Sequence, residues 1–135
     1  MRLRKLRRAA FRVAVGALLL AAAIPKILDP PDFLSAVAAY QWSGSWWISA
    51  ALVLPWLELC TAVALLAHPR LRRGAWLLSA SLFAIFAIAI SSALLRDLPI
   101  ECGCLPGLRD LRIGWPHAAT DLALGALCAA QLRRS

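Results

Sequence analysis

Residues 74–95 read GAWLLSASLFAIFAIAISSALL, an apolar run without a charged side chain. A helix of about 20 residues is long enough to cross the hydrocarbon core of a bilayer. This run therefore predicts a membrane-spanning helix.

Three further apolar runs flank it, at residues 13–28, 46–67 and 115–132. The chain has 135 residues, of which 61% are hydrophobic. A water-soluble domain of this size could not bury so much apolar surface away from water. We therefore predict an all-α integral membrane protein, a single domain over 1–135 that forms a bundle of four transmembrane helices. The first run also fits a cleavable signal peptide, but its continuation to Asp29-Pro30 favours a retained helix.

A short helix is predicted over about residues 31–41, after the first span. Pro30-Pro31-Asp32 is a favourable helix start, because proline suits the first turn and an acid complements the helix dipole. The segment is too short to cross a bilayer, so we expect an interfacial helix.

The net charge of +8 comes from Lys and Arg clustered between the apolar runs. Such clusters orient membrane proteins, so nucleic-acid binding is not expected and the lipid bilayer is the expected partner. The N-terminus, residues 68–73 and the C-terminus hold most of the cations, which predicts cytoplasmic termini in an inner (cytoplasmic) membrane. The loop 96–114 would then face the periplasm.

That loop contains Cys102-Gly103-Cys104. A disulfide between cysteines so close in sequence would be strained, and strained, exposed disulfides exchange readily. The first interpretation is a redox pair that exchanges with a thioredoxin-like partner, with Arg96, Arg109 or Arg112 favouring the thiolates. A static disulfide is the second, and a soft-metal site completed by His117 is the third.

Glu58 lies well inside the second apolar run. An ionisable group there is costly, so it usually faces the bundle interior and has a partner or a role. Lys26 and Arg96 are the candidate partners. Proton handling coupled to thiol oxidation and an ion pair that only locks the bundle are equally good interpretations.

Other reactive side chains favour structural interpretations. Cys60 and Cys128 lie at similar depths in their spans and could face each other, but buried cysteine is also an ordinary small apolar residue. His117 is expected to be an interface residue, and Asp121 is a shallower version of Glu58.

Several motifs in chain order resemble the MauE family, a membrane group related to the DoxX-like proteins. They are Gly16, Pro25-Lys26, Asp29-Pro30, Tyr40, Leu54-Pro55-Trp56-Leu57-Glu58-Leu59 and Cys102-Gly103-Cys104. The resemblance implies a four-helix membrane bundle and a link to methylamine utilisation. It also implies a periplasmic thioredoxin-like partner (MauD-like) in maturation of the disulfide-rich small subunit of methylamine dehydrogenase.

The expected function is therefore a membrane thiol–disulfide redox component that serves periplasmic protein maturation. Cys102 and Cys104 would be the exchanging catalytic pair, and Glu58 and Lys26 would support them from the bundle. A quinone is a candidate electron acceptor, by analogy with other four-helix thiol oxidases. The alternatives are a non-catalytic membrane anchor or assembly subunit and a soft-metal-handling membrane protein.

Overall fold

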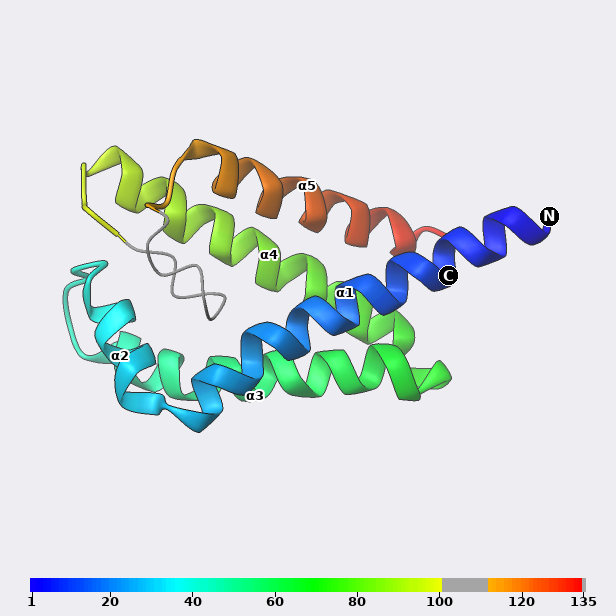
Figure 1. Ribbon diagram of the computed structural model, residues 1–135, viewed down its shortest axis with the longest axis horizontal. Coiled ribbons are helices and arrows are strands. Elements are labelled where there is room, and N and C mark those ends of the chain that lie inside the picture. Colours follow the sequence, from blue (N-terminus) through cyan, green and yellow to red (C-terminus); the bar gives the residue numbers. More distant parts are fainter. Residues whose placement is uncertain (101–111, 135) are drawn as a thin grey trace.

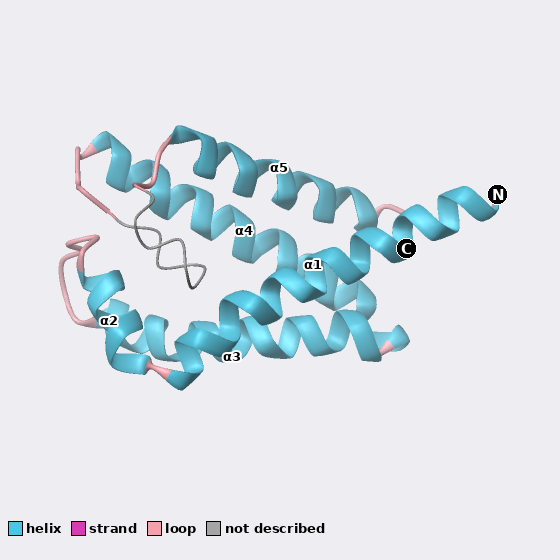
Figure 2. Cartoon of the chain, in the orientation of Figure 1, coloured by secondary structure: helices cyan, strands magenta, loops and turns pink. Residues whose placement is uncertain are grey.

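The structure is a computed structural model that describes residues 1–100 and 112–134. These residues form α-helices and one short 3-10 helix, without a β-strand (Figure 1, Figure 2). The elements are α1 (Arg2–Leu28), α2 (Pro30–Ala38), α3 (Trp46–Ala67), η1 (Pro69–Leu71), α4 (Arg72–Leu95) and α5 (Trp115–Leu132). The all-α prediction is confirmed for the described chain.

Three of these segments are long and apolar enough to cross a membrane: α1, α3, and η1 together with α4. The 18-residue α5 is not among them, because its apolar sequence is interrupted by His117, Asp121 and Gln131. The described residues therefore contain three candidate spans, where four transmembrane helices were predicted.

The basic N-terminal segment is part of the first helix. α1 begins at Arg2, well before the apolar run that starts at residue 13. The basic first turns and the apolar part therefore form one continuous helix. The short helix is present as α2, in which Asp29 caps the N-terminus by accepting a hydrogen bond from the Asp32 N–H at 3.2 Å.

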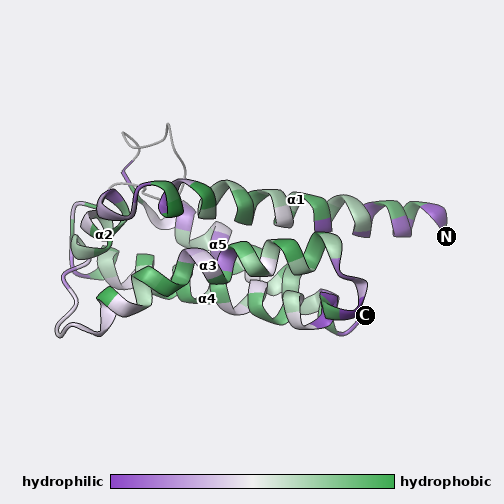
Figure 3. Cartoon of the chain, turned by 90° about the horizontal axis from the view of Figure 1, so that it is seen from below, coloured by the Kyte–Doolittle hydropathy of each residue, from purple (hydrophilic) through white to green (hydrophobic). Residues whose placement is uncertain are grey.

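The helices pack as two pairs. α1 lies along α3, α4 lies along α5, and contacts between α3 and α4 join the pairs (Figure 1). The two termini and η1 lie at one end of the molecule, and α2 lies at the other. Figure 3 shows the same division, with hydrophilic residues at the N-terminal end of α1 and apolar residues along the middle of the helices.

Glycines set the closest approaches within both pairs. A Cβ atom at Gly16 of α1 would lie only 2.6 Å from Cγ of Leu66 in α3. A Cβ atom at Gly125 of α5 would lie 3.4 Å from the Ala80 carbonyl oxygen and 3.5 Å from Cβ of Phe83 in α4. Small residues are typical of such interfaces because they let helix backbones come close together.

The core is mostly apolar, but it also encloses polar side chains, and many large apolar side chains lie on the surface. Glu58, Thr61 and Ser79 are fully buried, whereas large apolar side chains such as Trp56 and Ile88 are more than half exposed on the outer surface. Exposed apolar surface on this scale is compatible with contact to a membrane. The apolar outer faces of the helices are those expected to contact lipid.

Candidate functional site

A buried ion pair joins α1 to α3. Lys26 Nζ donates hydrogen bonds to both carboxylate oxygens of Glu58, at 2.8 Å and 3.0 Å. The Lys26 side chain is 4% exposed and that of Glu58 is 0% exposed. The sequence-based expectation that Glu58 has a basic partner is thus met by Lys26.

A proline precedes each member of the pair. Pro25 lies inside α1 directly before Lys26, and Pro55 lies inside α3 three residues before Glu58. A proline lacks the N–H that would donate to the carbonyl four residues earlier, so each helix carries a weakened turn beside its charged residue.

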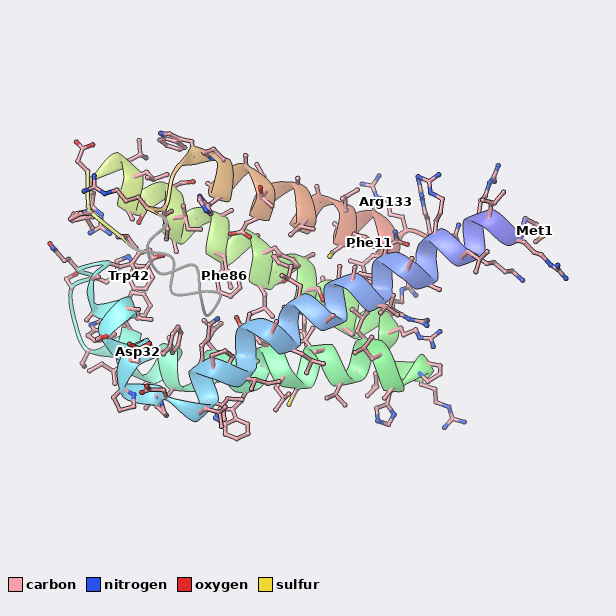
Figure 4. The ribbon with its side chains drawn as sticks, in the orientation of Figure 1. Met1, Phe11, Asp32, Trp42, Phe86 and Arg133 are labelled. Atoms are coloured by element: carbon pink, nitrogen blue, oxygen red, sulfur yellow. The ribbon has the colours of Figure 1, made fainter. Side chains whose placement is uncertain are left out.

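Two aromatic rings cover the ammonium group. Lys26 Nζ lies 5.1 Å from the ring centroid of Phe33 in α2 and 5.3 Å from that of Phe86 in α4. Both distances are within the range of cation–π attraction. In Figure 4, Phe86 lies in the space between α4 and α1. Lys26 is therefore contacted by side chains of α2, α3 and α4.

A cavity of about 290 Å³ lies beside the ion pair, between α1, α4 and α5. Lys26 is the charged residue that α1 contributes to its wall, whereas α5 contributes His117 and Asp121. The remaining wall is largely apolar: Leu18, Leu19, Ala22, Phe83, Phe86, Ile90, Ile113, Pro116, Thr120 and Leu124. An apolar cavity with a few convergent polar groups is the usual form of a small-molecule site.

The cavity wall continues to the base of the thiol loop. The Ile113 N–H donates a hydrogen bond to the Ile100 carbonyl at 3.1 Å, so the two ends of the loop are held together. Both side chains are buried in a cluster with Ile90, Ala93 and Ala118. The predicted redox residues Cys102 and Cys104, and also Arg109, lie outside the described residues.

His117 is positioned by a local cap. Its Nδ1 atom accepts a hydrogen bond from the Gly114 N–H at 3.2 Å, at the start of α5. The sequence interpretation treated His117 as an interface residue and Asp121 as a shallower case of the kind that Glu58 represents. In the structure both line the cavity that Lys26 also lines. Their spacing of four residues, which puts two side chains on one helix face, is the signal that could have found them.

Arg96 is not a partner of Glu58, which corrects one of the two expected pairings. Its Nη2 atom donates to the Tyr40 carbonyl at 2.7 Å, and its Nε atom donates to the Ser92 carbonyl at 3.2 Å. The reason is its position: Arg96 follows the last residue of α4, where it satisfies carbonyls beyond the end of α2. It joins the two helix ends outside the ion-pair site.

Cys60 and Cys128 do not face each other. Cys60 is exposed on the outer surface of α3, whereas Cys128 is buried in the core, and both are free thiols. The interpretation as a buried small apolar residue therefore agrees with the position of Cys128, but it is wrong for Cys60, which α3 turns to the outer surface. Among the described residues, no group of three or more His, Cys, Asp or Glu side chains could hold a metal ion.

These features are those of an all-helical membrane protein with a charged pair and a cavity inside its bundle. The chain belongs to the MauE family: the family described as "Methylamine utilisation protein MauE" matches residues 5–133. Three helices of spanning length and composition agree with the membrane association of that family.

Two curated relatives carry the same description. The chain is 40% identical over 116 residues to "Methylamine utilization protein MauE" of Methylophilus methylotrophus. The matched region covers 84% of this chain and 60% of that protein. It is 36% identical over 100 residues to "Methylamine utilization protein MauE" of Methylorubrum extorquens, which covers 73% of this chain and 53% of that protein. The chain thus matches between half and two thirds of the relatives' length. No solved structure matches it.

Proposed function

We propose that this chain is a membrane thiol–disulfide redox component that supports protein maturation for methylamine utilisation. Membership of the MauE family and the names of the two relatives support the pathway. The observation that carries the chemical part is the buried Lys26–Glu58 pair beside a cavity whose wall includes Ile113, at the base of the Cys-Gly-Cys loop.

The exchanging pair is Cys102 and Cys104. Cys102 follows Ile100 by two residues, so the chain limits the distance between their Cα atoms to about 7 Å. A partner thiolate attacks one sulfur of the Cys102–Cys104 disulfide and forms a mixed disulfide. The second partner thiolate then attacks the partner's sulfur in the mixed disulfide and releases the cysteine thiolate of this chain. The partner gains a disulfide, and the Cys102–Cys104 pair takes up two electrons and two protons. A periplasmic thioredoxin-like protein is the proposed partner.

Reoxidation of the pair releases the same two electrons and two protons. Glu58 and Lys26 are proposed to support proton movement inside the bundle, because Lys26 lines the cavity and is hydrogen-bonded to the carboxylate behind it. A membrane quinone is the proposed electron acceptor. The cavity suits such a flat, mostly apolar ring, since its walls are apolar apart from Lys26, His117, Thr120 and Asp121.

The proposed arrangement in the inner membrane has both termini in the cytoplasm and the thiol loop in the periplasm. The grouping of the termini and η1 at one end of the molecule supports it, since those segments carry most of the cations (Figure 1). α5 is then the fourth span, and its polar residues His117 and Asp121 face the cavity rather than lipid.

Thiol trapping of the purified full-length chain, with mass spectrometry across a dithiothreitol or glutathione series, tests the redox proposal. We expect a reversible Cys102–Cys104 disulfide whose midpoint potential lies near those of periplasmic exchange catalysts. A disulfide that persists under strongly reducing conditions would exclude exchange. Thiols that never pair would also exclude it, and bound copper or zinc lost in a Cys102→Ser/Cys104→Ser variant would then identify a metal site.

The contribution of the ion pair is tested separately. Glu58→Gln should slow reoxidation of the reduced pair while leaving its midpoint potential unchanged, because a proton route changes the rate and not the equilibrium. Thr61→Val is the matched control, since Thr61 is equally buried in α3 and bonds only to the Leu57 carbonyl. Equal reoxidation rates in wild type and Glu58→Gln would remove Glu58 from the mechanism.

The second candidate is a non-catalytic membrane assembly subunit with a structural disulfide loop. The burial of the Lys26–Glu58 pair, which joins α1 to α3, favours it, because such a pair can serve to fix how two helices dock. Partner maturation that survives in the Cys102→Ser/Cys104→Ser variant identifies this candidate.

A further inference from the structure

A second region with partly buried charged side chains lies at the end of the molecule that holds both termini, opposite α2 (Figure 1). A cavity of about 330 Å³ opens there between the N-terminal turns of α1, the first turn of α4 and the end of α5. Five cationic side chains line it: Lys5, Arg8, Arg12, Arg72 and Arg134. In Figure 4, nitrogen-tipped side chains crowd this end, around the labelled Phe11 and Arg133.

Two of these guanidinium groups have unmet hydrogen-bonding capacity. The Nε atoms of Arg12 and Arg72 are buried and have no hydrogen-bond partner. A buried donor without a partner is costly, and more so on a charged group. Both side chains line the same cavity, so an anion placed in it would lie beside both guanidinium groups.

The described helix segments at this end carry no acidic side chain. Residues 1–16, 68–80 and 124–134, which include the parts of α1, α4 and α5 at this end, contain no Asp or Glu. Clustered cations repel one another, and the repulsion is strongest where the groups are partly removed from water. An anion bound among these cations would relieve that repulsion.

The walls favour a particular anion. Guanidinium forks match the oxygens of phosphate in bidentate geometry. The indole of Trp76 forms part of the wall and stacks on Phe11 with ring centroids 5.6 Å apart.

The neighbouring space distinguishes a lipid from free phosphate. A second cavity of about 520 Å³ shares Arg8, Gln131 and Arg134 with the first. Arg4 and Arg7 add further cations to its wall, and Phe11 and Leu127 add apolar side chains. A phosphate alone would not use these apolar walls, whereas the glycerol part of a lipid would.

We propose that Arg12 and Arg72, with Arg8 and Arg134, form a binding site for the phosphate of an anionic phospholipid headgroup. The site is independent of the thiol loop and of the redox proposal. As a consequence, one lipid connects α1, α4 and α5 at this end. The contacts between protein groups alone leave the cations of these helices facing one another.

Native mass spectrometry of the full-length chain in a neutral detergent tests this proposal. The chain is titrated with short-chain phosphatidylglycerol, short-chain phosphatidylcholine and inorganic phosphate in parallel. We expect one phosphatidylglycerol per chain, bound at least about tenfold more tightly than phosphatidylcholine, because the headgroup adds charge-assisted hydrogen bonds. Inorganic phosphate that binds as tightly as phosphatidylglycerol would overturn the lipid assignment.

Matched variants locate the site. Arg12→Gln/Arg72→Gln should weaken phosphatidylglycerol binding by about tenfold or more. Arg70→Gln/Arg73→Gln removes the same charge from exposed residues of the same turn, outside the cavity, and should weaken binding less than about threefold. Equal losses in the two variants would show diffuse attraction and overturn the site.

A charge-conserving variant protects the test against misfolding. Arg12→Lys/Arg72→Lys keeps both charges but lacks the forked donors, so we expect an intermediate loss of phosphatidylglycerol affinity with an unchanged helical circular dichroism spectrum. Affinity equal to wild type in this variant would overturn the assignment of the guanidinium donors.

Discussion

At the scale of single residues, the buried Lys26–Glu58 ion pair places the strongest energetic constraint on the interior of the bundle. Two charges removed from water lose several kcal/mol of hydration each, and the loss is offset only by good geometry and hydrogen bonds. Here Lys26 donates to both carboxylate oxygens, at 2.8 Å and 3.0 Å, and its ammonium also faces two phenyl rings. The pair is balanced only while both members are present.

Removal of one member should therefore be more damaging than removal of both. We expect Lys26→Met and Glu58→Leu to lower the free energy of unfolding by about 3–5 kcal/mol each, because each leaves a buried charge unpaired. The double variant should lose much less than the sum. Unfolding in mixed micelles, followed by circular dichroism, measures all three values.

Thr61→Val provides the control for this cycle, since it removes a buried hydroxyl from α3 without touching the pair. Strictly additive losses in the double variant would mean that the two side chains do not interact energetically, contrary to the structure.

At the scale of helices, glycine determines how closely α4 and α5 pack. Gly125→Leu should lower the free energy of unfolding by about 1–3 kcal/mol, because the added side chain meets the α4 backbone, which cannot move aside. Gly74→Leu is the matched control: a Cβ atom there has no neighbour within 4 Å, and the better helix propensity should be neutral or favourable by about 1 kcal/mol. Equal effects at both positions would contradict the packing of α5 on α4.

The contact between α1 and α3 has a different partner and needs a double-mutant cycle. Gly16→Ala places a Cβ atom against the Leu66 side chain, which can rotate, so we expect a loss of about 1–2 kcal/mol in the free energy of unfolding. Leu66→Ala removes the obstacle, so the two changes should couple by about 0.5 kcal/mol or more. Additive behaviour, measured by the same unfolding assay, would show that Gly16 and Leu66 are not in contact.

At the scale of the whole molecule, the question is whether α5 crosses the membrane. Single cysteines at Ser43, Arg70 and Arg134, in a background with the native cysteines replaced by serine, can be labelled with a membrane-impermeant maleimide. We expect labelling at Ser43 in spheroplasts with an intact inner membrane, and at Arg70 and Arg134 only after permeabilisation, because the polar residues of α5 face the cavity. Arg70 and Ser43 serve as references for the two sides.

Labelling at Arg134 without permeabilisation would place the C-terminus on the side of Ser43 and leave three spans. The structure would then need α5 to lie along α4 outside the hydrocarbon region, which the burial of Cys128 among core residues disfavours.

The amino-acid sequence by itself determined the helical class and the need for a partner at Glu58. Hydropathy and proline placement act within a few turns of chain, so the apolar runs and the start of α2 could be read locally. The rule that a buried ionisable group needs a counter-charge limited the candidates for Glu58 to Lys26 and Arg96.

Only the tertiary structure decided which candidate pairs with Glu58, and which residues share a cavity. Lys26 reaches Glu58 because α1 lies along α3, whereas Arg96 is used by carbonyls beyond α2. The wall formed by Lys26, His117 and Asp121, and the arginine cavity at the termini, both join segments far apart in sequence. Such groupings depend on helix order, rotation and register, which no local pattern specifies because they result from packing between helices.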